Sequence, residues 1–510
     1  MLAGVKSYAL EGLEGYAVDV EVDVNNGLPG VETVGLASAA TKESKERVRA
    51  AIKNSGFSYP MRRITVNLAP AETKKEGAAL DLPIAIGISV CAETVTGRLY
   101  KDFVMIGELA LNGDLRHVNG VMPLLISAMQ KGEKKFILPA ANAAEAGYID
   151  GIEAYAFGNL REVVEFLNGA PAEPVAKRGF EAARKTLRYD VDMADVKGQA
   201  AAKRALEIAV AGGHNVLMSG PPGAGKTMLA RCVPTIMPDM TFAEAVEVTK
   251  IHSVAGILDG SEGIVAVRPF RTPHHTATVP ALIGGGAKAR PGEVSLAHNG
   301  VLFLDEMPEY SRHALETLRQ PLEDKKVTVA RVMHSVEYPA NFMLVASMNP
   351  CPCGNYGSRT QTCRCTAAQI HAYMSKLSGP LLDRIDLQIE VDGVEYAELR
   401  GGERGETSAE VKERVERARA VQRRRFEGRD IATNSQMTAK DIAKYCAVDE
   451  NGERLLKKAF DKMGLTARAT TRILKVARTI ADLACSAEIQ SAHLAEAIQY
   501  RSFDLDTAEE

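Results

Sequence analysis

A glycine-rich segment that follows a short apolar run carries the clearest chemistry in this chain of 510 residues. Glycines let backbone N–H groups curl round phosphate oxygens, where a Cβ atom would collide. Lys226 would then reach the β- and γ-phosphates, and Thr227 would offer its hydroxyl to Mg²⁺. The pattern predicts a site for ATP and Mg²⁺ between a strand and a helix N-terminus. The residues expected to contact the nucleotide are Gly220, Pro221, Pro222, Gly223, Ala224, Gly225, Lys226 and Thr227.

Two acids follow a second apolar run further along the chain. Residues 300–304 (GVLFL) are closed by Asp305 and Glu306. A buried parallel strand that ends at an active site is expected to have this composition. Asp305 would hold Mg²⁺, directly or through water, and Glu306 would polarise the attacking water. The alternative is a buried strand capped by an ordinary acidic turn; the spacing after a phosphate loop favours hydrolysis.

The composition of the chain limits which partners and which cellular location we expect. The chain is 46% hydrophobic and 25% charged, with a formal charge of −3, so it has no global basic field for nucleic acid. A polyanionic partner would have to be held by local basic groups. No apolar run approaches the roughly 18–20 residues of a membrane span, and residues 1–6 lack a signal-peptide layout. We therefore expect a cytoplasmic protein with reduced cysteines and no membrane partner.

Periodicity indicates an α/β chain with several domains. Residues 17–24 alternate as a strand, 37–55 are typical of a helix, and 63–68 form another expected strand. Pro and charged residues near 171–190 indicate a linker. We predict four segments: an α+β domain over 1–170, a linker over 171–191, an ATPase core with a parallel sheet over 192–395, and a helical linker with a C-terminal lid over 396–510.

The first of these segments resembles a known family. Residues 74–81 (KKEGAALD), 107–113 (GELALNG) and 119–122 (NGVM) are similar to the proteolytic domain of Lon, which uses a serine nucleophile and a lysine base. The resemblance puts the serine position at Ala79 and the lysine position at Met122. Neither side chain can attack or deprotonate a substrate. The resemblance therefore implies a Lon-like fold without protease activity.

The central segment resembles AAA+ ATPases. Residues 196–199 (VKGQ), with the helix expected over 200–211, are similar to the entry segment of that family. The resemblance implies that Asn349, at the end of a third apolar strand, is the first sensor of the γ-phosphate or the attacking water. A turn residue before Pro350 is the alternative.

Residues 378–387 (SGPLLDRIDL) resemble the arginine-finger segment of the MCM and magnesium-chelatase branch of AAA+ proteins. The resemblance implies that Arg384 completes the site of a neighbouring subunit, which requires a ring or another multimer. An ion pair of Arg384 with Asp383 or Asp386 is the alternative. The resemblance also implies a second sensor, an arginine that contacts the γ-phosphate. By spacing this is Arg468, and Arg472, one helical turn further on, is the alternative.

Residues 323–336 alternate and indicate a β-hairpin before the third strand. MCM helicases carry a similar hairpin that touches single-stranded DNA, and Arg331 occupies the matching position, with Lys325 and Lys326 nearby. A solvated hairpin is the alternative. A loop over 268–290 mixes basic, aromatic and glycine residues that could follow a phosphodiester backbone.

Four cysteines are grouped as two C-x-C pairs, Cys351 with Cys353 and Cys363 with Cys365. Four thiolates at this spacing could close a tetrahedral structural Zn²⁺ site. Because C-x-x-C pairs are more usual, free thiols and iron–sulfur or redox chemistry stay as alternatives.

Taken together, the segments resemble the YifB/ComM family of bacterial magnesium-chelatase-like ATPases over nearly the whole chain. The resemblance implies a hexameric, ATP-driven DNA helicase that drives branch migration in recombination or natural transformation. The alternative is a magnesium-chelatase-like ATPase that remodels a protein partner and does not act on DNA.

Overall fold

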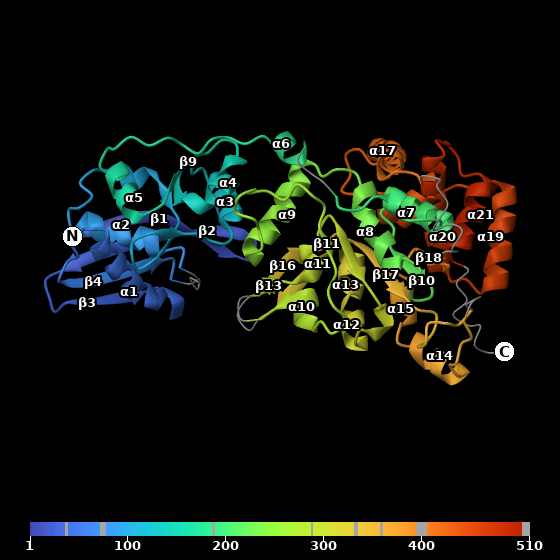
Figure 1. Ribbon diagram of the computed structural model, residues 1–510. Coiled ribbons are helices and arrows are strands. Elements are labelled where there is room, and N and C mark those ends of the chain that lie inside the picture. Colours follow the sequence, from blue (N-terminus) through green and yellow to red (C-terminus); the bar gives the residue numbers. More distant parts are fainter. Residues whose placement is uncertain are drawn as a thin grey trace. The chain divides into compact units, whose positions relative to one another are not determined.

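Two β-sheets, each with its own helices, organise the computed structural model of the chain (Figure 1). The structure describes residues 1–35, 39–71, 78–185, 189–286, 289–330, 335–357, 361–393 and 405–501. It divides into two units, of which the first contains Met1–Leu187 and Thr241–Val267. The second contains Arg188–Met240 and Arg268–Glu510. The chain therefore leaves the second unit after Met240 and returns to it at Arg268.

The first unit is built on a seven-stranded mixed sheet with the order β3-β4-β2-β1-β5-β8-β9. Its strands β1 and β2 pair as an antiparallel hairpin, and β8 pairs parallel with β5 and β9. Alternation sets the buried face, since Val18, Val20 and Val22 are fully buried. The strands are β1 (Leu2–Glu11), β2 (Glu14–Asn25), β3 (Gly30–Val34), β4 (Arg63–Ala69), β5 (Val104–Met105), β8 (Lys135–Pro139) and β9 (Glu153–Phe157), with a separate small ladder of β6 (Glu108–Leu109) and β7 (Leu115–Arg116).

Helices α2 and α3 of the first unit pack on strands β1 and β2. Ten of the eleven residues of α2 are buried, as its apolar sequence requires. The helices of this unit are α1 (Ala39–Asn54), α2 (Asp81–Cys91), α3 (Val121–Gln130), α4 (Ala143–Gly147), α5 (Leu160–Leu167), α6 (Phe180–Lys185) and α9 (Phe242–Ala255). Helix α6 lies within the segment that the sequence predicts to be a linker.

Helix α9 belongs to the first unit although it follows the phosphate loop in the sequence. It packs on α3, and the Ser253 hydroxyl donates to Glu145 Oε2 at 2.8 Å and accepts from the Gly120 amide at 3.0 Å. The sequence assigns this segment to the core over 192–395. Its periodicity identifies a helix but carries no information about which sheet the helix covers.

The second unit is built on a five-stranded sheet with the order β11-β14-β17-β10-β18. All neighbouring strands are parallel, so their carboxyl ends meet at one edge. The predicted parallel sheet is thus confirmed. The strands are β10 (Val216–Ser219), β11 (Phe270–Arg271), β14 (Val301–Leu304), β17 (Met343–Met348) and β18 (Leu387–Glu390).

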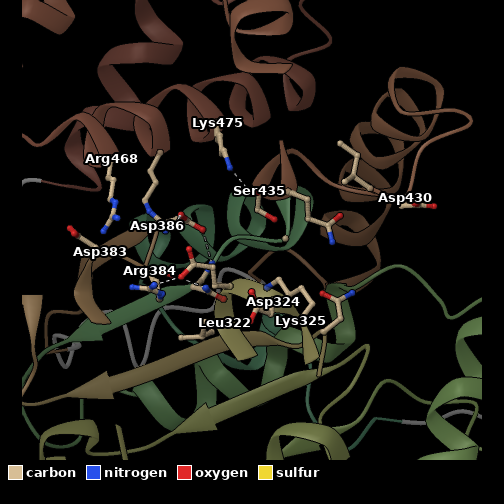
Figure 2. A pocket seen from close by; sticks show the side chains of 17 residues that line it. Leu322, Asp324, Lys325, Asp383, Arg384, Asp386, Asp430, Ser435, Arg468 and Lys475 are labelled. Carbon is tan, nitrogen blue, oxygen red and sulfur yellow. Dashed lines mark hydrogen bonds and ion pairs between the residues drawn. The ribbon is translucent and has the colours of Figure 1, made fainter. Parts of the chain in front are cut away.

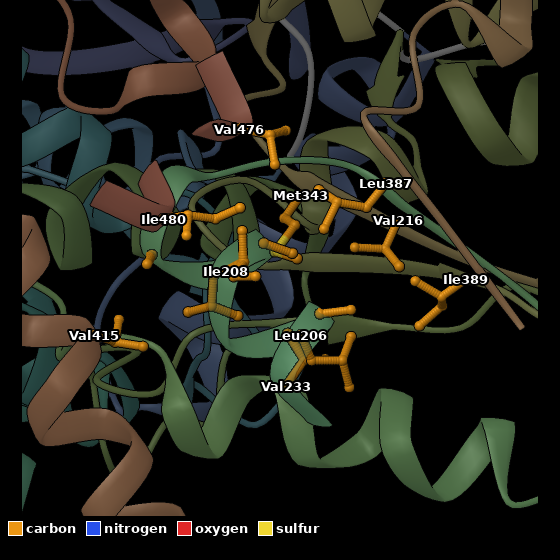
Figure 3. Packing of buried hydrophobic residues seen from close by; sticks show 14 of the residues in the cluster. Leu206, Ile208, Val216, Val233, Met343, Leu387, Ile389, Val415, Val476 and Ile480 are labelled. Atoms are coloured by element: carbon orange, nitrogen blue, oxygen red, sulfur yellow. The ribbon is translucent and has the colours of Figure 1, made fainter. Parts of the chain in front are cut away.

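The core of the second unit joins this sheet to helices from distant parts of the sequence (Figure 3). Leu206 and Ile208 of α7 (Ala200–Gly212) pack with Val216, and the same cluster contains Val415 and Ile480 of the C-terminal region. Fully burying one such aliphatic side chain stabilises the fold by about 1.5–3 kcal/mol. The core strands and the C-terminal helices therefore form one hydrophobic core.

The C-terminal region of the described chain is helical, as its sequence predicts. Its helices are α17 (Ser408–Arg425), α18 (Ala439–Tyr445), α19 (Glu450–Met463), α20 (Ala467–Leu483) and α21 (Ser491–Gln499), the last three red in Figure 1. The other helices of the second unit are α7, α8 (Lys226–Ile236), α10 (Val279–Ile283), α11 (Glu293–Leu296), α12 (Arg312–Thr317), α13 (Arg319–Asp324), α14 (Ala367–Met374) and α15 (Gly379–Leu382). Of the helices that the structure describes, none combines the length and the apolar character that a membrane span needs.

The predicted hairpin is present as β15 (Lys326–Ala330) paired antiparallel with β16 (Ser335–Pro339). Residues 331–334, which include Arg331, lie outside the described residues. A second short ladder joins β12 (Gly284–Gly285) to β13 (Arg290–Pro291) in the loop over 268–290.

A buried carboxylate ties the C-terminal helices together. Asp482 of α20 is 2% exposed and accepts from both Arg425, at 2.5 and 2.7 Å, and Arg478, at 3.0 and 3.1 Å. The side-chain carboxamide of Asn434 donates to the same carboxylate at 2.8 Å. A buried charge of this kind is compatible with folding only because each oxygen has donors.

We expect Asp482→Ala to lower the free energy of unfolding by about 3–5 kcal/mol, because the buried Arg478 and the partly buried Arg425 lose their counter-charge. Urea unfolding followed by far-UV circular dichroism measures this, since the chain contains no Trp. The exposed Asp461→Ala on α19 is the matched control and should shift the midpoint little. Equal midpoints for the two variants would contradict the assignment.

Candidate nucleotide-hydrolysis site

The glycine-rich loop joins the end of β10 to the start of α8. Gly225 precedes the helix with φ +87°, and Gly223 has φ +78°, conformations that favour glycine. Gly220 is required for a different reason, because a Cβ atom there would lie 2.1 Å from the carbonyl oxygen of Val391. The loop backbone is therefore fixed by local conformation and by the neighbouring chain, with the N-terminus of α8 directed at the site.

Lys226 links the loop to the third apolar strand. Its ammonium group donates to the carbonyl oxygens of Gly220 and Pro221 at 2.5 and 2.9 Å, and to Asn349 Oδ1 at 3.2 Å. Burial lowers the pKa of Lys226, and the carboxylates of Asp305 and Glu306 oppose this shift. The predicted phosphate-binding lysine and the predicted sensor amide are thus in direct contact.

Asp305 and Thr227 come together from the ends of β14 and the loop. The Thr227 hydroxyl donates to Asp305 Oδ2 at 3.1 Å, and the Ser347 hydroxyl donates to Asp305 Oδ1. Hydroxyl and carboxylate oxygens are the ligands that Mg²⁺ accepts beside nucleotide phosphates. Residues Thr227 and Asp305 therefore fit a magnesium ion, which would shield phosphate charge when bound.

Glu306 follows Asp305 in a left-handed conformation, φ +50°. Its backbone amide donates to Asp305 Oδ1 at 3.1 Å and to Ser347 Oγ at 3.2 Å. A non-glycine residue in this conformation is strained and persists only where its surroundings hold it. The turn leaves the Glu306 side chain half exposed beside the loop, with His275 Nδ1 at 4.0 Å from its carboxylate.

Ser347 is a residue of the site that its sequence pattern did not single out. It lies two residues before Asn349, so strand alternation puts both side chains on the same face of β17 and its continuation. That spacing is a usable signal, because a polar residue inside a fully buried strand needs a partner. Here the partner is Asp305, the predicted Mg²⁺ ligand.

The predicted arginines lie in a different place. Arg384, Arg468 and Arg472 line a cavity of about 610 Å³ (Figure 2). Figure 2 shows Arg468 and Lys475 reaching from α20 toward this cavity, as their positions on one helix face allow. The wall also contains Asn215, Asn341 and Asp386, which precede β10, β17 and β18. The cavity therefore lies at the amino ends of the strands, opposite to the phosphate loop.

Asp386 anchors this cavity. Its carboxylate accepts hydrogen bonds from the Arg472 side chain, from the backbone N–H of Asn215 at 3.2 Å, and from His214 Nδ1 at 3.3 Å. Burial raises the pKa of Asp386, but the charge of Arg472 and the contact with His214 outweigh burial, so the net shift is downward. Arg472 is thus committed to an ion pair that the sequence did not predict.

Arg384 and Arg468, unlike Arg472, do not pair with Asp386. The Arg384 side chain pairs with Glu323 and donates to the Pro380 carbonyl at 2.7 Å, while its Nε has no partner among the described residues. The predicted alternative partners Asp383 and Asp386 do not hold it. Arg468 is exposed at the start of α20.

The structure also describes the two predicted DNA-binding lysines and the four predicted zinc ligands. Lys326 is exposed on the hairpin and pairs with Glu337 at 2.9 Å. Lys325 lies at the hairpin base and lines the arginine cavity, where burial lowers its pKa. The Sγ atoms of Cys351, Cys353, Cys363 and Cys365 all lie within 4.8 Å of one another.

Comparisons with known proteins cover nearly the whole chain. Residues 192–399 match the family described as magnesium chelatase, subunit ChlI, and residues 20–142 and 405–501 match the ChlI subunit and its C-terminal part. Competence protein ComM of Haemophilus influenzae is 45% identical over 506 residues, which cover 98% of this chain and 97% of that protein. The chain belongs to the YifB/ComM family of magnesium-chelatase-like ATPases.

A protein named YifB from Salmonella typhimurium is 42% identical over 506 residues, or 99% of this chain and 97% of that protein. As a family member the chain is an AAA+ ATPase with ATP and Mg²⁺ as its implied cofactors. Lon protease 2 of Bacillus subtilis is 30% identical over 155 residues, or 29% of this chain and 28% of that protein.

Ala79 and Met122 are the positions that the resemblance to Lon assigns to the catalytic dyad in this YifB/ComM-family chain. The carbonyl of Ala79 accepts from the Gly107 amide at 2.8 Å, and Met122 is fully buried in α3. A methyl group and a thioether cannot supply a nucleophile and a base.

We expect Ser347→Ala to raise the Mg²⁺ concentration needed for half-maximal ATP hydrolysis by about 10–100-fold, because Asp305, the predicted Mg²⁺ ligand, loses its hydrogen bond. Steady-state turnover measured against a Mg²⁺ titration tests this. The exposed Ser335→Ala on β16 is the control. An unchanged Mg²⁺ requirement would show that Ser347 does not support Asp305.

Proposed function

We propose that this chain is the subunit of a ring-forming ATP-driven motor that translocates on DNA during recombination or natural transformation. The proposal of a ring is supported by one observation: the candidate catalytic groups are divided between opposite edges of one sheet. The hydrolytic residues lie at the carboxyl ends of the strands, and the arginines lie at the amino ends.

Within one subunit the roles follow from the contacts. Lys226 binds the β- and γ-phosphates, Thr227 and Asp305 hold Mg²⁺, and Glu306 orients the attacking water. Asn349 contacts Lys226, so it is positioned to sense the γ-phosphate next to that ammonium group. The nucleotide cradle is completed by the backbone amides of residues 220–225.

Arg384 and Arg468 act on the nucleotide of the next subunit. Strand β10 has four residues and separates the two edges by roughly 13 Å, so these side chains are not placed to reach the phosphate loop of their own chain. Packing the amino edge of one copy against the carboxyl edge of the next would deliver both arginines. A head-to-tail contact of this kind closes into a ring, for which we propose six subunits.

The proposed DNA contact is the β15–β16 hairpin. Arg331 follows β15 directly in the sequence and lies outside the described residues, whereas Lys326 is an exposed residue of β15. Lys325 is turned toward the arginine cavity, so the proposal rests on Arg331 and Lys326. The name of the ComM relative ties that protein to competence, which supports DNA over a protein partner.

The segments predicted from the sequence become part of the proposal. Residues 1–170 form a Lon-like domain without protease activity, 192–395 the motor core, and 396–510 a helical linker and lid. The structure adds residues 241–267 to the first unit, so the motor is connected to that unit by more than the linker over 171–191.

Subunit mixing tests the trans arrangement. We expect Arg384→Ala to lower ATP turnover by about 10³–10⁵-fold, because transition-state charge on the neighbour's nucleotide is no longer neutralised. Glu306→Gln should bind ATP without turning it over. Mixed rings should recover part of the activity, since an Arg384→Ala subunit keeps its own hydrolytic acid and receives a finger from its Glu306→Gln neighbour. No recovery at any mixing ratio, with mixed rings verified by mass, would contradict the proposal.

DNA-stimulated hydrolysis tests the substrate. We expect single-stranded or branched DNA to raise ATP turnover, and Arg331→Ala to bring the ratio of stimulated to basal turnover toward one. The slope of DNA affinity against salt should fall by about one for each phosphate that the variant no longer neutralises. Lys462→Ala, an exposed cation on α19, is the control. Turnover indifferent to every DNA form would favour the protein-remodelling alternative.

A further inference from the structure

The Sγ atoms of the four clustered cysteines lie as close together as the ligands of one metal ion do. The Sγ–Sγ distances are 3.4 Å between Cys351 and Cys353, 3.7 Å between Cys351 and Cys363, and 3.6 Å between Cys353 and Cys363. A disulfide requires about 2.05 Å. Thiolates on a tetrahedral metal at about 2.3 Å from each sulfur are separated by about 3.8 Å. The spacing fits metal coordination and does not fit a disulfide.

Backbone amides are directed at these sulfurs. The Tyr356 amide donates to Cys351 Sγ at 3.3 Å, and the Cys365 amide donates to Cys363 Sγ at 3.4 Å. The amides of Asn355 and Arg364 donate to Cys353 Sγ. Amide donors stabilise thiolate sulfur, and this outer layer of hydrogen bonds is a regular feature of metal centres. Backbone donors thus point at three of the four sulfurs, as they do around the sulfur ligands of a metal.

The centre lies against the nucleotide site. Cys351 is fully buried and follows the sensor Asn349 by two residues. Gly354 packs on the phosphate loop so closely that a Cβ atom there would lie 2.6 Å from Pro222 Cδ. On the other side, the Asn349 amide contacts the Tyr373 hydroxyl of α14, which follows the last cysteine. The cysteine loop therefore touches the phosphate loop, and the helix that follows it contacts the backbone of Asn349.

We propose that Cys351, Cys353, Cys363 and Cys365 bind one structural Zn²⁺ as thiolates, and that this centre braces Asn349 against the phosphate loop. Four sulfur ligands select a soft, tetrahedral ion and exclude Mg²⁺ and Ca²⁺. The four cysteines fill all four positions of a tetrahedral ion, so no position is left open for a substrate or a catalytic water. The ion would therefore act by holding the loop in place. Iron in the same four-sulfur geometry shares this chemistry, and the experiment separates the two metals.

Metal analysis of the purified full-length protein is the first test. We expect about one zinc per chain and no stoichiometric iron. The Cys363→Ser/Cys365→Ser double variant should lose the zinc. Cys485→Ser, which changes an exposed cysteine outside the cluster, should retain it, and so should Lys226→Ala, which alters only the nucleotide site. A wild-type protein without zinc, or with iron and its visible absorption, overturns the assignment.

A spectroscopic measurement keeps the test independent of whether the cysteine variants fold. Wild-type protein exchanged with Co²⁺ should show the ligand-field and thiolate charge-transfer bands of a tetrahedral four-sulfur site, and added Zn²⁺ should remove them. Bands typical of octahedral oxygen coordination would contradict the proposal. Titration with a thiol-specific mercurial should release the zinc in proportion to the cysteines modified.

The bracing role rests on the proposed ATPase function and is measured separately. We expect zinc-depleted protein to bind a fluorescent ADP analogue but to turn over ATP at least about tenfold more slowly, with recovery on adding Zn²⁺. Depleted protein as active as the zinc-loaded form overturns the bracing role. If zinc-loaded protein hydrolyses no ATP, the proposed function fails while the zinc content still decides the metal assignment.

Discussion

The parallel pairing of β10, β14 and β17 is the constraint on which the candidate site depends. Parallel strands bring their carboxyl ends to one edge, so the residues that follow Ser219, Leu304 and Met348 must meet there. The phosphate loop, the acidic pair and the sensor amide come from well-separated parts of the sequence. A few backbone hydrogen bonds between strands and the burial of their apolar side chains bring them within hydrogen-bond distance.

The same sheet explains why the arginines are elsewhere. Arg384 precedes β18 and therefore lies at the opposite edge, where Asp386 holds Arg472 and His214 around a polar cavity. A group that neutralises transition-state charge is useful only close to the phosphate. In our proposal the second copy supplies this proximity, so each nucleotide site is formed by two chains and hydrolysis depends on assembly.

Helix α9 gives the first unit a connection to the motor that is independent of the linker. The chain passes from α8, which begins at Lys226, to α9 and then returns to β11. Glu145 fixes α9 through Ser253, and its other oxygen accepts from Asn142 at 2.8 Å. Burial raises the pKa of Glu145, and these hydrogen bonds oppose the shift. The Met122 backbone amide donates to the same carboxylate at 3.0 Å, so α3 and α9 are tied to one buried acid.

The sequence by itself determined the local chemistry: the glycine loop, the acids at 305 and 306, the hairpin and the helices with clear periodicity. These features depend on neighbouring residues, since turn conformation and alternation are properties of short segments. Only the tertiary structure decided that Ser347 supports Asp305, that Asp386 takes Arg472, and that residues 241–267 join the first unit. Each of these depends on which distant surfaces meet, and a one-dimensional pattern of apolar and polar residues does not specify that choice. The edge of the sheet on which a side chain falls was likewise set by strand direction, and it separated the arginines from the phosphate loop.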